Sequence, residues 1–137
     1  MKPGLAAVTR LLGEAALPVA DLSEAKLAHF LGRGAADAPQ GVVGLELYPP
    51  VALLRSLAVA PNVRGRGVGK ELLADAERYA RSHQVKDIYL LTTTAERFFA
   101  RAGYARVARE NAPSEIQRTE EFSTLCSATS ALMHKRL

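Results

Sequence analysis

The spacing of hydrophobic and polar residues predicts an ordered series of helices and strands. The first hydrophobic residues recur every three or four positions, which predicts an amphipathic helix over residues 4–16. Asp21 or Ser23 is placed to begin a second short helix, and a short strand is expected at 29–31. Residues 32–39 contain two glycines and favour a loop.

The middle of the chain predicts a hairpin followed by a strand–helix–strand unit. Residues 40–47 alternate weakly, and Pro49-Pro50 separates them from an apolar stretch at 51–59. A glycine-rich turn follows, and then an amphipathic helix is expected to about His83. A strand is expected over 87–93, because its centre, Ile88-Tyr89-Leu90-Leu91, is continuously apolar, as is typical of a buried parallel strand.

The last part of the chain adds shorter elements. A helix is expected over 95–102 with Gly103 as its terminator, followed by a strand over 104–108. A further helix is expected from Ser114 to about Leu125, and a strand over 131–137 closes the chain. This order predicts an α/β fold with one mixed sheet and helices on both of its faces.

Length and composition exclude several classes of protein. The 137 residues fit one domain, residues 1–137, which needs no metal or disulfide to fold. No apolar run approaches the ~20 residues of a membrane span, so no membrane partner is expected. Cys126 is the only cysteine, which favours a reducing, cytoplasmic compartment. The three histidines are scattered, so no metal site is predicted.

A basic, glycine-rich turn carries the strongest chemical signal. It reads Arg64-Gly65-Arg66-Gly67-Val68-Gly69-Lys70, in a chain of net charge +4. The N–H groups that begin a helix have no intrahelical partners, and glycines let the backbone close on a phosphate. The aromatic residues are not interleaved with the basic ones, so a pyrophosphate-bearing small molecule fits better than a nucleic acid.

Two common phosphate-binding patterns do not match this turn. Glu71 follows Gly69-Lys70, where a P-loop has Ser or Thr. The dinucleotide pattern fails because its last glycine would have to stand at position 70. The pattern that fits is Arg-x-x-Gly-x-Gly after an apolar strand, with Phe99 downstream four residues before Gly103-Tyr104.

Residues 53–104 therefore resemble the acetyl-CoA-binding core of the GNAT N-acetyltransferase superfamily. A wider resemblance, over 51–59, 89–95 and 121–126, is to small acetyltransferases associated with arsenic resistance. The resemblance implies a GNAT-like fold with splayed parallel strands, here without the usual N-terminal strand. It also implies direct attack of a primary amine on acetyl-CoA in a ternary complex.

The resemblance assigns the cofactor-binding residues. The backbone N–H groups of the turn would hold the pyrophosphate, and the strand before it would pair with the pantetheine arm. Thr92 stands where relatives often carry Asn near the pantetheine. Phe99 stands where many relatives carry a Tyr that protonates the departing thiolate, and Tyr89 or Tyr104 could substitute. The residues assigned in this way are Leu57, Ala58, Val59, Arg64, Gly65, Arg66, Gly67, Val68, Gly69, Lys70, Thr92 and Phe99.

The base and the substrate contact rest on single residues. Glu46 is the best-placed carboxylate for a general base, directly or through a water, and the alternative is a solvated strand carboxylate. Glu96 is a weaker candidate. Arg55 interrupts an apolar strand, and a buried guanidinium needs a partner. It either holds a substrate carboxylate, which we favour slightly, or pairs with an acid such as Glu46 across the hairpin.

A small-molecule amine, an amino acid or an analogue of one, is therefore the expected substrate. The alternatives are a protein N-terminal or lysine acetyltransferase, and a non-catalytic acyl-CoA-binding module. Residues 111–125 are either a lid over the substrate or packing. The missing N-terminal strand would expose a sheet edge near 29–31, so a homodimer is one expectation.

Overall fold

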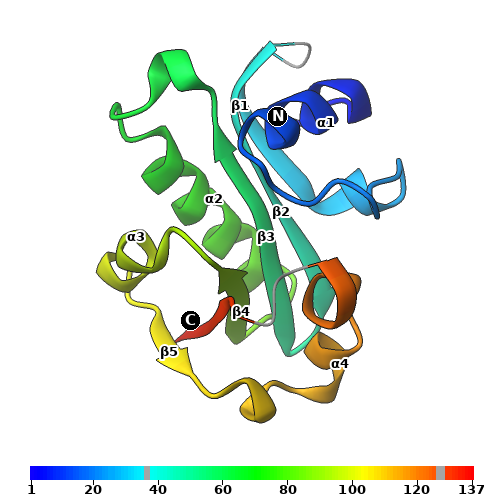
Figure 1. Cartoon of the computed structure of the whole chain (residues 1–137), viewed down its shortest axis with the longest axis vertical. Coiled ribbons are helices and arrows are strands. Elements are labelled where there is room, and N and C mark those ends of the chain that lie inside the picture. The colour runs from blue at the N-terminus through cyan, green and yellow to red at the C-terminus, as the bar shows by residue number, and fades with distance from the viewer. Residues whose placement is uncertain (36–37, 126–128) are drawn as a thin grey trace.

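A computed structural model describes residues 1–35, 38–125 and 129–137 (Figure 1). Its helices are α1 (Leu5–Glu14), α2 (Val68–Ser82), α3 (Glu96–Arg101) and α4 (Ser114–Gln117). Its strands are β1 (Phe30–Ala35), β2 (Ala38–Tyr48), β3 (Val51–Val59), β4 (Asp87–Thr92), β5 (Ala105–Val107) and β6 (Ala131–Arg136). Shorter turns are η1 (Lys26–His29), η2 (Pro61–Val63), η3 (Arg109–Asn111) and the π-helical η4 (Glu121–Leu125).

The strands form one mixed sheet in the order β1-β2-β3-β4-β6-β5. Strands β1, β2 and β3 are antiparallel neighbours, β3 and β4 are parallel, and β6 lies antiparallel between β4 and β5. The predicted mixed sheet, the hairpin at Pro49-Pro50 and the parallel strand–helix–strand unit are confirmed.

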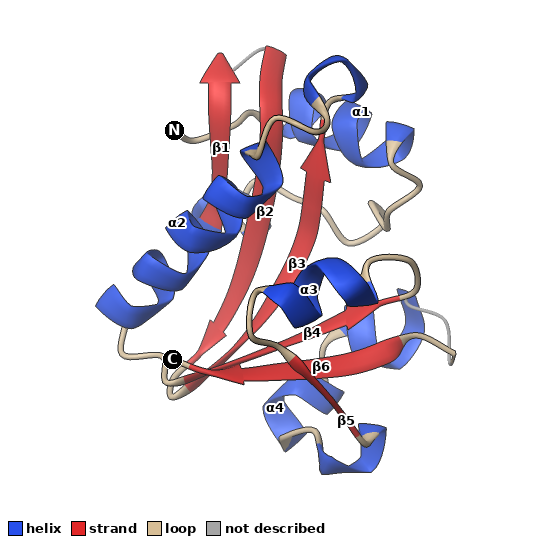
Figure 2. Cartoon of the chain, turned by 90° about the vertical axis from the view of Figure 1, so that its left-hand side faces the viewer, coloured by secondary structure: helices blue, strands red, loops and turns tan. Residues whose placement is uncertain are grey.

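Strands β3 and β4 separate soon after they begin. Their ladder pairs Val51 with Asp87, Ala52 with Ile88 and Leu53 with Tyr89, and it stops there although β3 continues to Val59. Figure 2 shows the two strands opening into a V. The backbone of the second half of β3 therefore faces a gap on its β4 side.

Helices cover both faces of the sheet. On one face, α2 buries Leu72, Ala76 and Ala80 against residues of β2, β3 and β4. On the other face, α1 packs against Val42 and Ala58, and α4 and η4 cover the strands near β6. The amphipathic patterns of α1 and α2 explain this arrangement, because each helix has one apolar stripe to bury. No helix in the described ranges is long and apolar enough to span a membrane.

Three predicted elements differ from the structure. The predicted loop at 32–39 is mostly strand, because β1 runs to Ala35 and β2 begins at Ala38, with Gly34 at φ +95° beside a bulge. Residues 36 and 37 lie outside the described residues. The short helix predicted from Asp21 or Ser23 is instead the turn η1. Its Lys26 N–H donates to Ser23 Oγ at 3.3 Å.

The predicted helix from Ser114 to Leu125 is interrupted after α4. The Thr119 hydroxyl donates to Ile116 O at 2.7 Å and accepts from Phe122 N–H at 3.2 Å. Such local side-chain bonds compete with regular helical hydrogen bonding, which explains why the chain turns here and resumes as η4.

The first residue takes part in the sheet edge. Within the described residues no strand precedes α1. Met1 nevertheless pairs with Gly32 of β1 in both directions, with N···O distances of 2.9 Å from Met1 N to Gly32 O and 2.9 Å from Gly32 N to Met1 O. The edge that we expected to be exposed is thus partly covered by the chain itself.

Candidate active site

The gap between β3 and β4 is a cavity of about 260 Å³, here named the β3–β4 cavity. Its walls come from the second half of β3, the end of β4 and the residues that lead into α3. Six of the residues assigned to the cofactor from the sequence line it together: Leu57, Ala58, Val59, Arg64, Thr92 and Phe99. The structure therefore brings together residues that are up to 42 positions apart in the chain, from Leu57 to Phe99.

The glycine turn forms the N-terminal end of α2. Gly65 and Gly67 have φ of +81° and +82°, where a β-carbon is disfavoured, and Gly67 is the residue before the first turn. A β-carbon built on either glycine would meet nothing within 4 Å, so open space lies beside the backbone. Exposed helix N–H groups beside open space fit a pyrophosphate.

The side chains near this cavity have local partners. Arg64 Nε donates to Val59 O at 3.2 Å, which ties the turn to the end of β3. Thr92 Oγ1 accepts from Ala95 N–H at 3.0 Å, and Phe99 is buried with 6% exposed. The Thr92 hydroxyl still has its own hydrogen to donate into the cavity.

A bulge at Ser56 changes the direction of the β3 side chains. Ser56 has φ +60°, in the left-handed region, and the β2–β3 register shifts between Val42 and Gly44. Before the bulge Leu54 packs toward α2, whereas after it Leu57 packs on that side. The extra residue therefore shifts the alternation of faces by one position.

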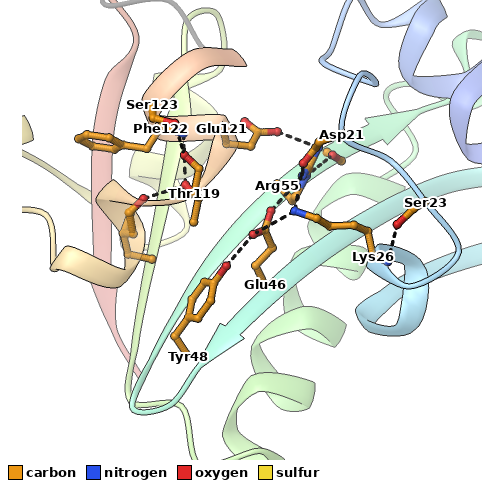
Figure 3. A network of polar contacts seen from close by, with 12 residues as sticks. Asp21, Ser23, Lys26, Glu46, Tyr48, Arg55, Thr119, Glu121, Phe122 and Ser123 are labelled. Atoms are coloured by element: carbon orange, nitrogen blue, oxygen red, sulfur yellow. Dashed lines mark hydrogen bonds and ion pairs between the residues drawn. The ribbon is translucent and has the colours of Figure 1, made fainter.

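Arg55 lies at the centre of a buried polar cluster (Figure 3). Its Nη1 bonds Glu46 Oε2 at 2.9 Å and also Asp21 Oδ2, and its Nη2 bonds Asp21 Oδ1 at 2.8 Å. Nη2 also lies 3.2 Å from Glu121 Oε1, and Nε donates to Ser56 Oγ at 3.0 Å. Each guanidinium nitrogen thus has a partner within the chain.

The cluster, here named the Arg55 cluster, includes a second cation. Lys26 Nζ lies 3.3 Å from Asp21 Oδ2 and 3.7 Å from Glu46 Oε1. Side chains of Arg55 and Asp21 are 0% and 1% exposed, so these charges are shielded from water. Burial of such charges is tolerated because they are paired and hydrogen-bonded.

The cluster shifts the ionisation of its members. Burial alone would raise the pKa of Asp21, but its hydrogen bonds with Arg55 and the nearby cations lower that pKa below the usual value. Burial and the hydrogen bond that Tyr48 donates to Glu46, at 2.8 Å, raise the pKa of Tyr48 to about 12. Tyr48 is therefore a neutral hydrogen-bond donor that helps to fix Glu46.

A second cavity adjoins the first and is here named the acceptor cavity. Its volume is about 420 Å³, within the range of small-molecule sites. The two cavities share Leu17, Arg55, Ser56 and Leu91. The remaining walls are formed by Ala16, Pro18, Ala20, Thr93, Glu121 and Ser130. A molecule in the acceptor cavity would thus meet one in the β3–β4 cavity beside Arg55 and Ser56.

The residues predicted as acids or bases do not lie together at the cavities. Glu46 is 8% exposed and bonded to Arg55 and Tyr48, and it is not among the described residues that line either cavity. Glu96 is half-exposed and lies 3.7 Å from Arg106. Tyr104 donates to Glu77 at 3.0 Å, and burial raises its pKa, so its proton is held in the core.

The sequence did not predict a site role for Ser56, and it did not predict that Asp21 and Glu121 pair with Arg55. Asp21 and Glu121 come from irregular segments, and the only available signal was a carboxylate beside apolar residues. Cys126, the single cysteine of the sequence, lies outside the described residues. Among the described residues no group of three or more metal-ligating side chains is assembled.

Comparison with known proteins agrees with this fold. Residues 12–107 match the model of the acetyltransferase (GNAT) family. This match spans well over half of the chain, and the chain belongs to that family.

A sequence relative is the amino-acid acetyltransferase of Ralstonia nicotianae, which is 32% identical over 77 residues. The aligned region is 55% of this chain and 17% of that protein, so this chain corresponds to only a small part of it.

Two solved structures share the fold. N-acetylglutamate synthase from Neisseria gonorrhoeae, complexed with coenzyme A and N-acetyl-glutamate, has a TM-score of 0.80 at 21% identity, over 97% of this chain and 32% of the synthase chain. Rv2747 from Mycobacterium tuberculosis, in complex with CoA and NLQ, has a TM-score of 0.80 at 20% identity, over 100% of this chain and 98% of that chain. At these identities the likeness shows the fold.

Proposed function

We propose that this chain transfers an acetyl group from acetyl-CoA to the primary amine of a small molecule, by direct attack in a ternary complex. The observation that carries the proposal is the contact between the two cavities at Arg55 and Ser56. One cavity lies beside open β3 backbone and suits an extended chain, and the other has the volume of a small-molecule site. Solved structures of the same fold hold coenzyme A, which supports the choice of donor.

Acetyl-CoA would be held mainly by backbone. The N–H groups of the glycine turn would bind the pyrophosphate, and the free edge of β3 from Leu57 to Val59 would pair with the pantetheine arm. Arg64, Arg66 and Lys70 add positive charge beside the phosphates. When bound, acetyl-CoA supplies an activated acyl group, and this chain positions it at the mouth of the acceptor cavity.

An amino acid or an analogue is the acceptor class that we propose. Support comes from the relatives, one an amino-acid acetyltransferase and one crystallised with N-acetyl-glutamate. The sequence hypothesis assigns the substrate carboxylate to Arg55. Since every guanidinium nitrogen already has a partner, the carboxylate would exchange with one of the three protein carboxylates. The nearest to the acceptor cavity is Glu121.

Glu46 is the base proposed from the sequence. Its carboxylate lies beside Arg55 and outside the cavity lining, so it would act through a water. Its role is testable by Glu46→Gln, with a loss of kcat at neutral pH as the expected result and unchanged kcat as the contrary one.

The function is tested by the release of free thiol from acetyl-CoA with a panel of amines. The panel contains L-glutamate, L-glutamine, their α-amides, an arsenic-containing amino-acid analogue and a lysine-bearing peptide. We expect turnover with the free amino acids and a much higher KM for the α-amides. Preference for the peptide would favour a protein acetyltransferase, and binding of coenzyme A without turnover of any amine would favour a non-catalytic binding module.

A homodimer is a further part of the proposal. The outer edge of β1 pairs with Met1 at Gly32, and the rest of that strand edge can pair with a second copy. Sedimentation equilibrium is expected to give twice the monomer mass, and a monomer mass at high concentration would contradict it.

A further inference from the structure

Two residues that line the acceptor cavity come from short, irregular parts of the chain. Glu121 begins the π-helical η4, and Ser130 lies in a bend directly before β6. Both residues are buried. Because neither belongs to a strand or an α-helix, side-chain contacts contribute to where each of them lies.

One arginine contacts both of these places. Arg109 Nη1 donates to Ser130 O and to Ser130 Oγ, each at 3.1 Å. The Arg109 guanidinium carbon lies 4.7 Å from the centre of the ring of Phe122, which follows Glu121 in η4. A guanidinium suits this double contact, because it has a fork of N–H donors and is flat enough to lie on an aromatic ring.

The contact with Phe122 bears on Glu121 through the backbone of η4. Figure 3 shows the two side chains pointing in opposite directions, Glu121 toward Arg55 and Phe122 away from it. Phe122 packs against the apolar cluster that contains Ile116 and Leu132. The start of η4 is therefore held on one side by Phe122 and on the other by the ion pair of Glu121 with Arg55, at 3.2 Å.

Arg109 stands on a firmly packed part of the chain. It lies in η3, between Val107, which pairs with Leu132 of β6, and Ala112, which is buried in the core. The described lining of the two cavities does not include Arg109. Any influence of Arg109 on an acceptor is therefore exerted through the residues that it contacts.

We propose that Arg109 is a positioning residue that shapes the acceptor cavity, by holding Ser130 directly and Glu121 through Phe122. This inference rests on the proposed acetyltransferase function and concerns the acceptor side of the same site. The described lining of the β3–β4 cavity includes neither Ser130 nor Glu121, so the affinity for acetyl-CoA should not depend on Arg109. A wall that contacts the acceptor before and during the reaction affects its KM more than kcat.

The test is steady-state kinetics with the amino acid of the panel that wild type acetylates fastest. Arg109→Met removes the hydrogen bonds and the charge, and we expect the KM for the acceptor to rise about tenfold. The kcat and the KM for acetyl-CoA should change by less than about twofold. Calorimetry with the same amino acid in the presence of coenzyme A is expected to show a similar loss of affinity.

A conservative variant separates the contacts of Arg109 from its charge. Arg109→Lys keeps the charge, but an ammonium group cannot bond Ser130 as a fork and lie flat on Phe122 at the same time. We therefore expect most of the rise in acceptor KM to remain in Arg109→Lys. The matched control is Arg118→Met, which removes an exposed guanidinium nearer to Glu121 in the sequence and should follow wild type.

A double-mutant cycle tests the route through η4. Phe122→Leu keeps an apolar side chain and removes the aromatic ring that meets the guanidinium. If Arg109 acts through Phe122, the rise in acceptor KM in the double variant should be smaller than the product of the two single rises. A double variant whose rise equals that product would contradict this route.

Three further results would overturn the inference while the proposed function stands. One is a wild-type acceptor KM in Arg109→Met. Another is an equal rise of both KM values, which would mean that Arg109 supports the fold as a whole. The third is a wild-type acceptor KM in Arg109→Lys, which would assign the effect to charge alone.

Folding and the proposed function have their own readouts. Melting temperatures show which variants fold, and if Arg109→Met does not, Arg109→Lys and Phe122→Leu decide by the same acceptor KM, each expected to rise. If wild type releases no thiol with any amine of the panel, the proposed function fails and this inference falls with it.

Discussion

The β3–β4 cavity and the acceptor cavity share one wall, but different parts of the protein supply their chemistry. The first lies along the open backbone edge of β3 and reaches Arg64, where the glycine turn of residues 64–70 begins. The second is lined by the side chain of Arg55, on which the carboxylates of three residues converge: Asp21 from an irregular segment, Glu46 from β2 and Glu121 from η4. A site that binds its ligand through backbone groups tolerates changes of side chain, whereas the Arg55 cluster depends on the identity of each residue.

Removing the guanidinium of Arg55 should have the largest effect, because it would disrupt the Arg55 cluster. Arg55→Met leaves Asp21, Glu46 and Glu121 together with Lys26 as the cation of the cluster, so we expect a loss of about 3–5 kcal/mol in the free energy of unfolding. Urea denaturation measures it. The control is Arg33→Met, which removes a partly exposed guanidinium paired with Glu71 and Asp75 and costs about 1 kcal/mol or less. Equal losses in both variants would contradict a special role for the Arg55 cluster.

Neutralising Asp21 should be the next largest change. Asp21→Asn neutralises the carboxylate that bonds both terminal nitrogens of the guanidinium, at a cost of about 2 kcal/mol at pH 7.

The pH dependence of this loss has a definite sign. Because the folded-state pKa of Asp21 lies below its ordinary value of 3.8, its contribution to stability is present above about pH 4 and is lost as the pH falls through the lower folded-state value. Unfolding free energies of wild type and Asp21→Asn should therefore converge below pH 4. A constant difference down to pH 2 would argue against this pair.

A single β-carbon should weaken the backbone site. Gly67→Ala places a methyl group in the open space beside the first turn of α2, at φ +82°, and we expect about tenfold weaker binding of coenzyme A by calorimetry. Gly103→Ala imposes a similar strain, at φ +100°, away from this turn. That control should lose stability and keep its affinity for coenzyme A. Loss of affinity in both would mean that strain, not contact, is responsible.

Removing one hydroxyl should have the smallest effect. Tyr48→Phe deletes the hydrogen bond to Glu46, which should cost about 1 kcal/mol in stability. If Glu46 only supports Arg55, the pH–rate profile of this variant should match that of wild type. A shifted profile would indicate that Glu46 itself takes part in proton transfer.

The same contrast explains what could be predicted from the sequence. The glycine turn is contiguous and its proposed role depends on backbone, so its seven residues, together with Phe99 and Gly103-Tyr104 downstream, were enough to propose that role from the sequence. The contact between Glu46 and Arg55 followed from the hairpin at Pro49-Pro50, and it was one of the two alternatives that we considered. The fold class followed from the order of apolar segments and from the family resemblance.

The rest of the Arg55 cluster could not be predicted from the sequence because its residues come from irregular segments. Asp21 lies between α1 and η1, and Glu121 follows an interrupted helix, so no periodicity places either side chain. The interruption itself comes from one threonine hydroxyl that bonds both Ile116 O and Phe122 N–H. The left-handed conformation of Ser56 also has no sequence signal, since serine is seldom chosen for a positive φ.

That conformation matters for how relatives of this protein should be aligned. Before Ser56 the even-numbered residues of β3, such as Leu54, face α2, and after it the odd-numbered Leu57 and Val59 do. The alternation of β3 side chains between the two faces of the sheet therefore shifts by one residue at Ser56, and substitution patterns should be interpreted separately before and after it. A sequence comparison that assumes one unbroken alternation along β3 would assign hydrophobic exchanges in the second half of the strand to the wrong face of the sheet. A one-residue gap placed at Ser56 would have the same effect.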